Sequence, residues 1–239
     1  MRTIAIRIVG GLGNQLHCFA MGRAVAACNN AELIIDAESG FWRDPYGRQY
    51  ILDRIPGMHV RKMRFRRFPG YRTLFRLRIR TETWFSQFLP LSRKLVIEES
   101  IRTSYQDDIL RTSYKWNPYF IGYWACHRYY AAVQDELRAE LKPPVPQAPD
   151  ALALLAKIEA ADSCMVHWRS YVEEVSVRHP DLTDYYAEAM RLIEETHPDI
   201  HFFVFSDRPD LIGKALNTDR RNMTLVDLSS LGDEAQSLA

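Results

Sequence analysis

The sequence predicts an α/β protein whose sheets are parallel and covered by helices on both faces. Near the N-terminus, an alternating apolar strand that holds Ile4, Ile6 and Ile8 runs directly into a glycine-rich turn and a helix. After residue 149, strands and helices alternate regularly, which is the pattern of parallel strand pairing. The strand expected over 201–206 is apolar at consecutive positions, as a strand buried on both faces requires.

Two lobes are expected, separated by a proline-rich linker. Residues 143–149 contain four prolines, which favour a stiff extended segment over a helix or a central strand. The N-terminal lobe therefore covers 1–142 and the C-terminal lobe covers 150–239. The expected elements, in order, are a strand through Ile4 to Ile8, an amphipathic helix after Gly13, a second strand ending at Asp36, helices over 127–141 and 150–160, a strand over 163–168, a helix over 183–196, a strand over 201–206, a helix over 209–217, a strand over 223–226 and a last helix from Asp233.

The composition describes a nearly neutral protein with a substantial core. The 239 residues are 47% hydrophobic and carry a formal charge of +1, which argues against a general polyanion binder. The four cysteines show no metal-ligand spacing, so we interpret them as small buried hydrophobic residues of a reducing compartment. No apolar stretch reaches the ~18 residues of a membrane span. The first strand does not resemble a signal peptide, and a cytoplasmic location is expected.

Residues 61–80 form a basic segment that holds nine arginines and lysines and no acidic residue. Aromatic and aliphatic residues such as Phe65, Phe68 and Leu77 are interleaved with these charges. The pattern fits a solvated helical insertion, a contact with anionic lipid or, formally, single-stranded nucleic acid. We expect an anionic membrane surface and no nucleic acid, which would make the protein a peripheral one at the inner membrane.

The turn after the first strand has the chemistry of an anion site. Glycines at a strand-to-helix turn let backbone N–H groups approach an anion, and the helix N-terminus behind them carries partial positive charge. Gly11 and Gly13 supply that freedom, and Asn14 and Gln15 add amide donors. The spacing is neither the dinucleotide fingerprint nor a P-loop. A phosphate site and a tight turn without a ligand both fit this pattern.

A second candidate centre follows the strand over 163–168. His167 and Arg169 lie at its carboxyl end, the edge at which open parallel sheets bind ligands. A fixed guanidinium there would stabilise charge on a diphosphate leaving group without a metal. The alternative is a packed histidine beside a surface arginine. Asp207 follows the strand over 201–206 at the same edge, where it also suits a helix N-cap ahead of Pro209.

Six segments, in order along the chain, resemble the α-1,2-fucosyltransferases of glycosyltransferase family 11. The resemblance implies two Rossmann-like lobes of the glycosyltransferase B type, with a GDP-sugar between them. It also implies inverting transfer of L-fucose from GDP-fucose to a sugar hydroxyl, first of all O2 of galactose, on a glycan or lipid-linked oligosaccharide. The segments are Gly10 to Leu16, Leu33 to Asp36, Gly122 to Trp124 with His127 to Tyr130, Val166 to Arg169, Asp184 to Tyr186, and Phe202 to Asp207.

The resemblance assigns roles to individual residues. Arg169, with His167 beside it, matches the arginine that acts on the β-phosphate, and Ser206 and Asp207 match positions near the nucleoside. The glycine turn, with Gly11, Gly13, Asn14 and Gln15, would complete the donor site. The sequence contains no Asp-x-Asp pair of the kind that holds a divalent ion on the diphosphate. We therefore expect neither a metal nor another cofactor.

The chain departs from the family pattern after Arg169, where it reads Ser170 to Glu174 as if two residues were lost. The acceptor hydroxyl needs activation, either by a base or by the charge that develops on the leaving group, and four candidate bases stay open: His17, Asp36, Glu173 and Glu174. Family members continue past the last helix expected here, so we also expect a donor lobe that is shortened at its C-terminal end. The alternatives are transfer from another GDP-sugar, an inactive sugar-nucleotide-binding homologue and a peripheral membrane interaction protein.

Overall fold

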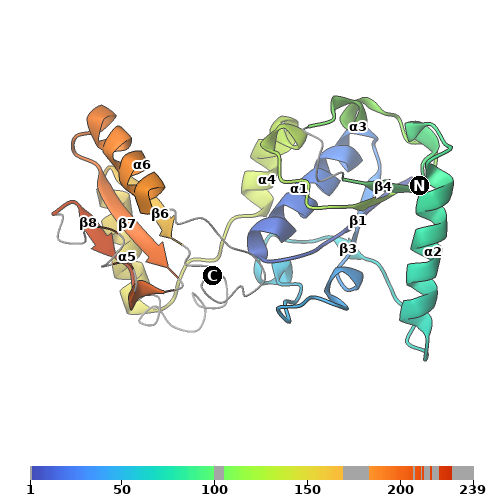
Figure 1. The fold of residues 1–239 in the computed structure, drawn as a ribbon, viewed down its shortest axis with the longest axis horizontal. Coiled ribbons are helices and arrows are strands. Elements are labelled where there is room, and N and C mark those ends of the chain that lie inside the picture. The colour runs from blue at the N-terminus through green and yellow to red at the C-terminus, as the bar shows by residue number, and fades with distance from the viewer. Residues whose placement is uncertain are drawn as a thin grey trace. The chain divides into compact units, whose positions relative to one another are not determined.

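The computed structural model describes residues 2–99, 105–168, 183–206, 208–210, 212, 216 and 221–227. The chain divides into two compact units, Met1–Pro144 and Val145–Ala239. Each unit holds a parallel sheet flanked by helices, so the α/β class and the parallel pairing are confirmed (Figure 1). In the described part of the chain, no helix is long and apolar enough to cross a membrane.

The N-terminal unit is built on a five-stranded parallel sheet in the order β3-β2-β1-β5-β4. The central strand β1 pairs with β2 on one side, from Thr3 opposite Glu32 to Arg7 opposite Asp36, and with β5 on the other. The elements are β1 (Thr3–Arg7), α1 (Leu12–Cys28), β2 (Glu32–Asp36), β3 (Arg61–Lys62), α2 (Tyr71–Ser86), β4 (Val96–Glu98), α3 (Asp107–Arg111), β5 (Tyr119–Ile121) and α4 (Gln134–Glu140), with 3-10 turns at Ser39–Phe41, Leu52–Arg54, Leu91–Arg93, His127–Tyr129 and Ala131–Val133.

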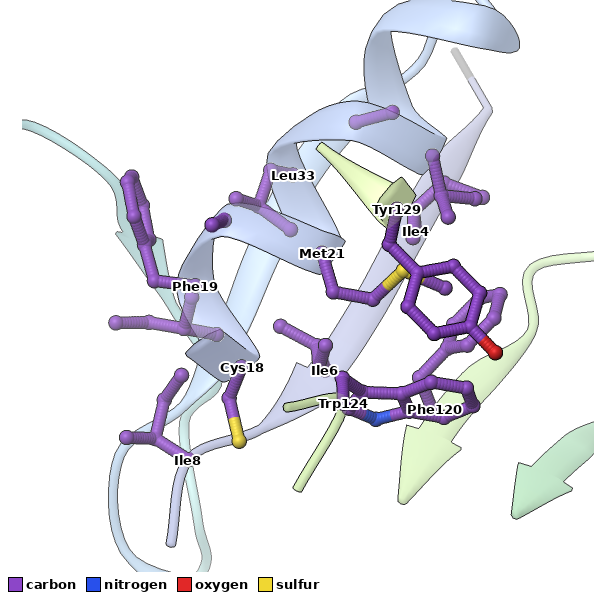
Figure 2. Close-up of a cluster of buried hydrophobic side chains, with 14 of the residues drawn as sticks. Ile4, Ile6, Ile8, Cys18, Phe19, Met21, Leu33, Phe120, Trp124 and Tyr129 are labelled. Carbon is purple, nitrogen blue, oxygen red and sulfur yellow. The ribbon is translucent and has the colours of Figure 1, made fainter. Parts of the chain in front are cut away.

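Helix α1 packs so closely on β1 that it requires a glycine. A Cβ atom on Gly22 would lie 2.7 Å from Cγ2 of Ile6, which is itself fully buried. Figure 2 shows Ile6 and Met21 beside the aromatic rings of Phe120 and Trp124. Burial of such side chains stabilises the unit by about 1.5–3 kcal/mol each.

The structure corrects two expectations for this unit. Helix α1 is buried around most of its circumference rather than amphipathic, because the sheet covers one side while α3 and the 3-10 turns after residue 126 cover the other. The single helix expected over 127–141 is instead two 3-10 turns followed by the short helix α4.

Helices α1 and α2 cover opposite faces of the sheet. The face turned to α2 carries Val96, Tyr119 and Ile121, which pack with Phe75 of α2. The ring of Phe75 lies edge-on to Trp42, with centroids 5.6 Å apart. The basic segment 61–80 is therefore the edge strand β3, a connection and most of α2, anchored in the core by its aromatic residues.

The C-terminal unit has a three-stranded parallel sheet in the order β6-β7-β8. Helix α6 packs with Phe202 and Val204 of β7, and α5 packs with Phe203 and Phe205 on the opposite face. The elements are α5 (Pro149–Ala160), β6 (Ser163–Trp168), α6 (Thr183–Thr196), β7 (His201–Ser206) and β8 (Met223–Leu225), so the predicted bounds of β6, α6 and β7 are confirmed.

Coverage of this sheet is incomplete on the face of α5. Met165 lies opposite Phe203 and is therefore on that face, yet it is 68% exposed. Strand β6 is an edge strand, and in the described part of the chain the buried cluster on α5 draws its strand residues from β7. The expectation of strands covered on both faces holds for β7, whereas Met165 of β6 is left exposed.

The cysteines differ in exposure, which makes their reactivity testable. Cys18 is fully buried, and burial raises the pKa of its thiol to about 12, whereas Cys28 is exposed, contrary to the expectation of four buried thiols. Because the thiolate is the reactive form, we expect a thiol reagent to modify Cys28 first and Cys18 only after unfolding. Mass spectrometry would test this, with Cys28→Ser as the control, and rapid native labelling of Cys18 would contradict it.

Candidate functional site

A cavity of about 900 Å³ opens at the carboxyl edge of the N-terminal sheet. Arg7 at the end of β1, Glu98 at the end of β4 and Tyr123 just after β5 line it, together with Gly10 of the glycine turn. Helix α2 forms another wall. Since ligands of open parallel sheets bind at the carboxyl ends of the strands, this cavity is the candidate site of the unit.

Two residues that line this cavity each hold a buried polar atom without a hydrogen-bond partner in the described part of the chain. The atoms are Nε of Arg7 and Oγ1 of Thr83. Buried polar groups in folded proteins almost always have a partner. Because both atoms are closed off from solvent, they do not by themselves indicate a ligand in the cavity.

The cavity is also rich in arginine. Arg43, Arg76 and Arg80 line it together with Arg7, and none of the four forms an ion pair with any residue that the structure describes. Guanidinium groups bind phosphate and carboxylate with paired hydrogen bonds. The site therefore suits an anionic or heavily hydroxylated ligand.

Two carboxylates, Asp44 and Glu98, are among the described residues that line the cavity, and they differ in their hydrogen-bond partners. Oδ1 of Asp44 accepts hydrogen bonds from the backbone N–H groups of Tyr46 and Arg48, at 2.9 and 3.0 Å, so it shapes the loop. Glu98 is exposed and makes no hydrogen bond or ion pair within the described ranges. A carboxylate that is free of protein partners in such a cavity is available as a base.

The segment Gly122 to Trp124 presents an aromatic ring to the cavity through a constrained backbone. Trp124 is fully buried and adopts a left-handed φ of +53°, which is costly for this residue type. The Glu99 carboxylate stabilises the turn by accepting hydrogen bonds from the backbone N–H groups of Tyr123 and Trp124. As a result Tyr123 is 47% exposed beside the cavity, where its ring could stack on a sugar.

The glycine turn reaches the cavity through Gly10, and none of the predicted donors Gly11, Gly13, Asn14 and Gln15 is among the residues that line it. Gly10 lines it and has a φ of +73° that favours glycine. Gly11 is the N-cap of α1 without a side-chain cap, and a Cβ atom on Gly11 or Gly13 would meet open space. Asn14 is half-buried and makes no hydrogen bond to the described chain, so its amide is available.

Gln15 is a structural clamp and not a donor to a ligand. Its side chain is 1% exposed. Nε2 donates to the carbonyl oxygens of Gly10 and Gln49, each at 2.9 Å, and Oε1 accepts from the N–H of Ile51 at 3.0 Å. The amide predicted to face an anion instead ties the glycine turn to the loop at 49–51.

Replacing Gln15 should therefore destabilise the N-terminal unit. Gln15→Leu leaves three backbone groups without partners, and we expect the free energy of unfolding to fall by about 3 kcal/mol. Chemical denaturation would measure this. Asn14→Ala is the control, expected to stay within about 0.5 kcal/mol. Equal stability of Gln15→Leu and the wild type would show that the clamp contributes nothing.

Two of the predicted bases are engaged elsewhere. Asp36 is fully buried and its carboxylate accepts hydrogen bonds from the N–H of Glu38 at 3.0 Å, from the N–H and hydroxyl of Ser39, and from Tyr119. Burial and the charge of Asp36 raise the pKa of Tyr119, which keeps that phenol a donor. Asp36 therefore holds the turn after β2. His17 contacts the hydroxyl of Tyr130 through Nδ1 at 2.9 Å and does not line the cavity.

The second predicted centre lies partly outside the described residues. Strands β6 and β7 end together, with Trp168 opposite Ser206. His167 is exposed on β6, and its carbonyl oxygen accepts a hydrogen bond from Tyr186 at 2.8 Å. Ser206 is buried and its hydroxyl accepts from the N–H of Arg208 at 2.9 Å. Four of the predicted site residues lie outside the described ranges: Arg169, Glu173, Glu174 and Asp207.

Comparison with known proteins finds similarity to glycosyltransferases. One relative is an alpha-1,2-colitosyltransferase from Escherichia coli, 26% identical over 215 residues that cover 87% of this chain and 69% of the relative. No protein-family model matches the chain.

Two solved structures of the fucosyltransferase NodZ are also similar. One, from Bradyrhizobium, is 13% identical and covers 96% of this chain and 79% of its own, with a TM-score of 0.48. The other is NodZ α-1,6-fucosyltransferase soaked with GDP-fucose, also 13% identical, covering 98% and 79% with a TM-score of 0.47.

Proposed function

We propose that this protein is an inverting glycosyltransferase that moves L-fucose from GDP-fucose to O2 of a galactose residue. The observation that supports it most is the similarity to an enzyme named for an α-1,2 sugar transfer, which extends over 87% of the chain. The six family-like segments agree with this function. The acceptor we propose is a glycan carried by a lipid, met by a cytoplasmic protein at the inner membrane.

The two units have different tasks in this proposal. The cavity of the N-terminal unit binds the acceptor, since it combines aromatic rings for the sugar faces with arginine side chains for the hydroxyl groups. The C-terminal unit binds the nucleotide through Arg169, Ser206 and Asp207. His167 and the glycine turn support the diphosphate.

The reaction is a single displacement. The acceptor hydroxyl gives its proton to a carboxylate, for which we propose Glu98, and its oxygen attacks C1 of the sugar from the face opposite the phosphate. The bond from C1 to the β-phosphate oxygen breaks, and its electron pair leaves with GDP. Arg169 stabilises that charge. The configuration at C1 is inverted.

Nucleotide selectivity tests the proposal. We expect GDP to bind and UDP and ADP not to bind, because the donor resemblance is to GDP-sugar enzymes. Isothermal titration calorimetry would measure this, and equal affinity for GDP and UDP would contradict the donor class. Transfer should survive EDTA, since the sequence offers no Asp-x-Asp pair. A strict Mn²⁺ requirement would overturn this part.

A colitosyl donor is the second candidate, because the relative from Escherichia coli is named for that sugar. Turnover assays with several GDP-sugars would decide between the donors. An inactive sugar-nucleotide-binding homologue would bind GDP but neither transfer nor hydrolyse any of them.

A further inference from the structure

Helix α2 carries a second apolar face that points away from the core. Leu74, Leu77, Trp84 and Phe85 are 55–60% exposed, and Phe88, just after the helix, is 70% exposed. Leu77 follows Leu74 by three residues, and Trp84 follows Leu77 by seven. Phe85 and Phe88 follow Leu74 and Leu77 by eleven residues each. These spacings place all five side chains on one side of the helix. The core side is a different one, because Phe75 and Ser86 are the buried residues of α2.

This outer face is continuous rather than a scatter of single residues. The ring of Trp84 lies 5.5 Å from that of Phe85 and 5.2 Å from that of Phe88, measured between centroids. Within the described chain nothing covers these rings. Contiguous exposed apolar surface of this kind marks an interaction site more often than isolated residues do.

The charges around the apolar face are mainly basic. Arg80 lies three residues after Leu77 and four before Trp84, so it borders this face, and the connection before the helix adds the exposed residues Arg64, Arg66 and Arg67. The one acidic residue of α2 is Glu82, and it is neutralised by Arg78 at 2.7 Å. An apolar face with tryptophan, phenylalanine and leucine, bordered by arginine, is the pattern of a helix that lies in a membrane interface.

We propose that α2 and Phe88 dock on a bilayer containing anionic phospholipid. The apolar side chains enter the boundary between headgroups and acyl chains, and the guanidinium groups contact lipid phosphates. Leu77 and Trp84 of this apolar face also line the cavity at the sheet edge, together with Arg76, Arg80 and Thr83 of the same helix. Docking therefore brings the cavity to the membrane surface, and if the proposed function holds, it selects a lipid-borne acceptor.

Vesicle sedimentation of the whole chain tests the proposal. We expect binding to vesicles of equal parts phosphatidylcholine and phosphatidylglycerol, and at least about tenfold weaker binding to phosphatidylcholine alone. Replacing Phe85 and Phe88 with serine should weaken binding about tenfold or more. Leu152 and Leu192 of the C-terminal unit, 42% and 50% exposed, are the matched positions, and the same change there should have no effect.

Charge is tested separately from apolar contact. Replacing Arg64, Arg66 and Arg67 with glutamine should reduce binding to the mixed vesicles by about tenfold, since each basic residue near an anionic surface contributes. The control is the same change at the exposed positions Arg111, Arg138 and Arg191. Circular dichroism and GDP titration of all variants separate loss of docking from misfolding and from failure of the proposed function.

Three results would overturn the proposal. One is equal binding of the wild type to both vesicle types, and another is an equal loss in the control variants. The third is dimerisation by sedimentation velocity that the serine variants abolish, with no vesicle binding at all, because the occupant would then be a second copy of this chain.

Discussion

Replacing Arg169 with alanine is expected to lower turnover about a hundredfold or more. Arg169 comes directly after Trp168 in the sequence, and Trp168 and Ser206 end β6 and β7 opposite each other. If its guanidinium meets the β-phosphate, the variant leaves the charge of the departing GDP without its partner. Loss of such a charge-assisted contact costs about 2–4 kcal/mol in the transition state.

The control is the conservative variant. Arg169→Lys should recover little activity, because an ammonium group cannot reproduce the paired hydrogen bonds of a guanidinium. Both variants should keep the wild-type circular dichroism spectrum and melting temperature, since neither removes a buried apolar group. Near-normal turnover and GDP affinity in Arg169→Ala would show that the diphosphate is held elsewhere, for instance by the glycine turn.

Local sequence patterns sufficed to predict three elements of the C-terminal unit. Strands β6 and β7 and helix α6 coincide with their predicted bounds because runs of apolar residues and helical periodicity are local signals. The cover of β6 could not be predicted, because it depends on how far α5 extends over its neighbours. Met165 of β6 is apolar in the sequence and yet exposed in the structure.

The site in the N-terminal unit was harder to predict, since its members come from distant segments. Asp36 looked like a base at a strand end, but Tyr119, 83 residues away, donates a hydrogen bond to it and makes it a structural group. Glu98 ends a strand of three residues, which is too short for a periodicity signal. Arg7 was visible only as a charge inside a core strand. From the sequence, the arginines of the basic segment fitted either a membrane surface or a ligand, and the structure places Arg76 and Arg80 on the cavity.

The largest effect expected in the N-terminal unit is that of Glu98→Gln. The amide fills the same space as the carboxylate but cannot take the proton of the acceptor hydroxyl. Loss of a general base lowers turnover typically 10²–10⁴-fold, and we expect a loss of about that size. GDP affinity should stay unchanged, because Glu98 belongs to the acceptor cavity and no role in nucleotide binding is assigned to it.

A control carboxylate outside the cavity distinguishes loss of a base from a general effect of removing a negative charge. Glu136 is an exposed acidic residue of α4 that does not line the cavity, and Glu136→Gln should leave turnover at the wild-type level. If turnover in Glu98→Gln stays within about threefold of the wild type, the proton goes to another group. Of the candidates from the sequence, Glu173 and Glu174 would then be the next to replace, because Asp36 and His17 already have protein partners.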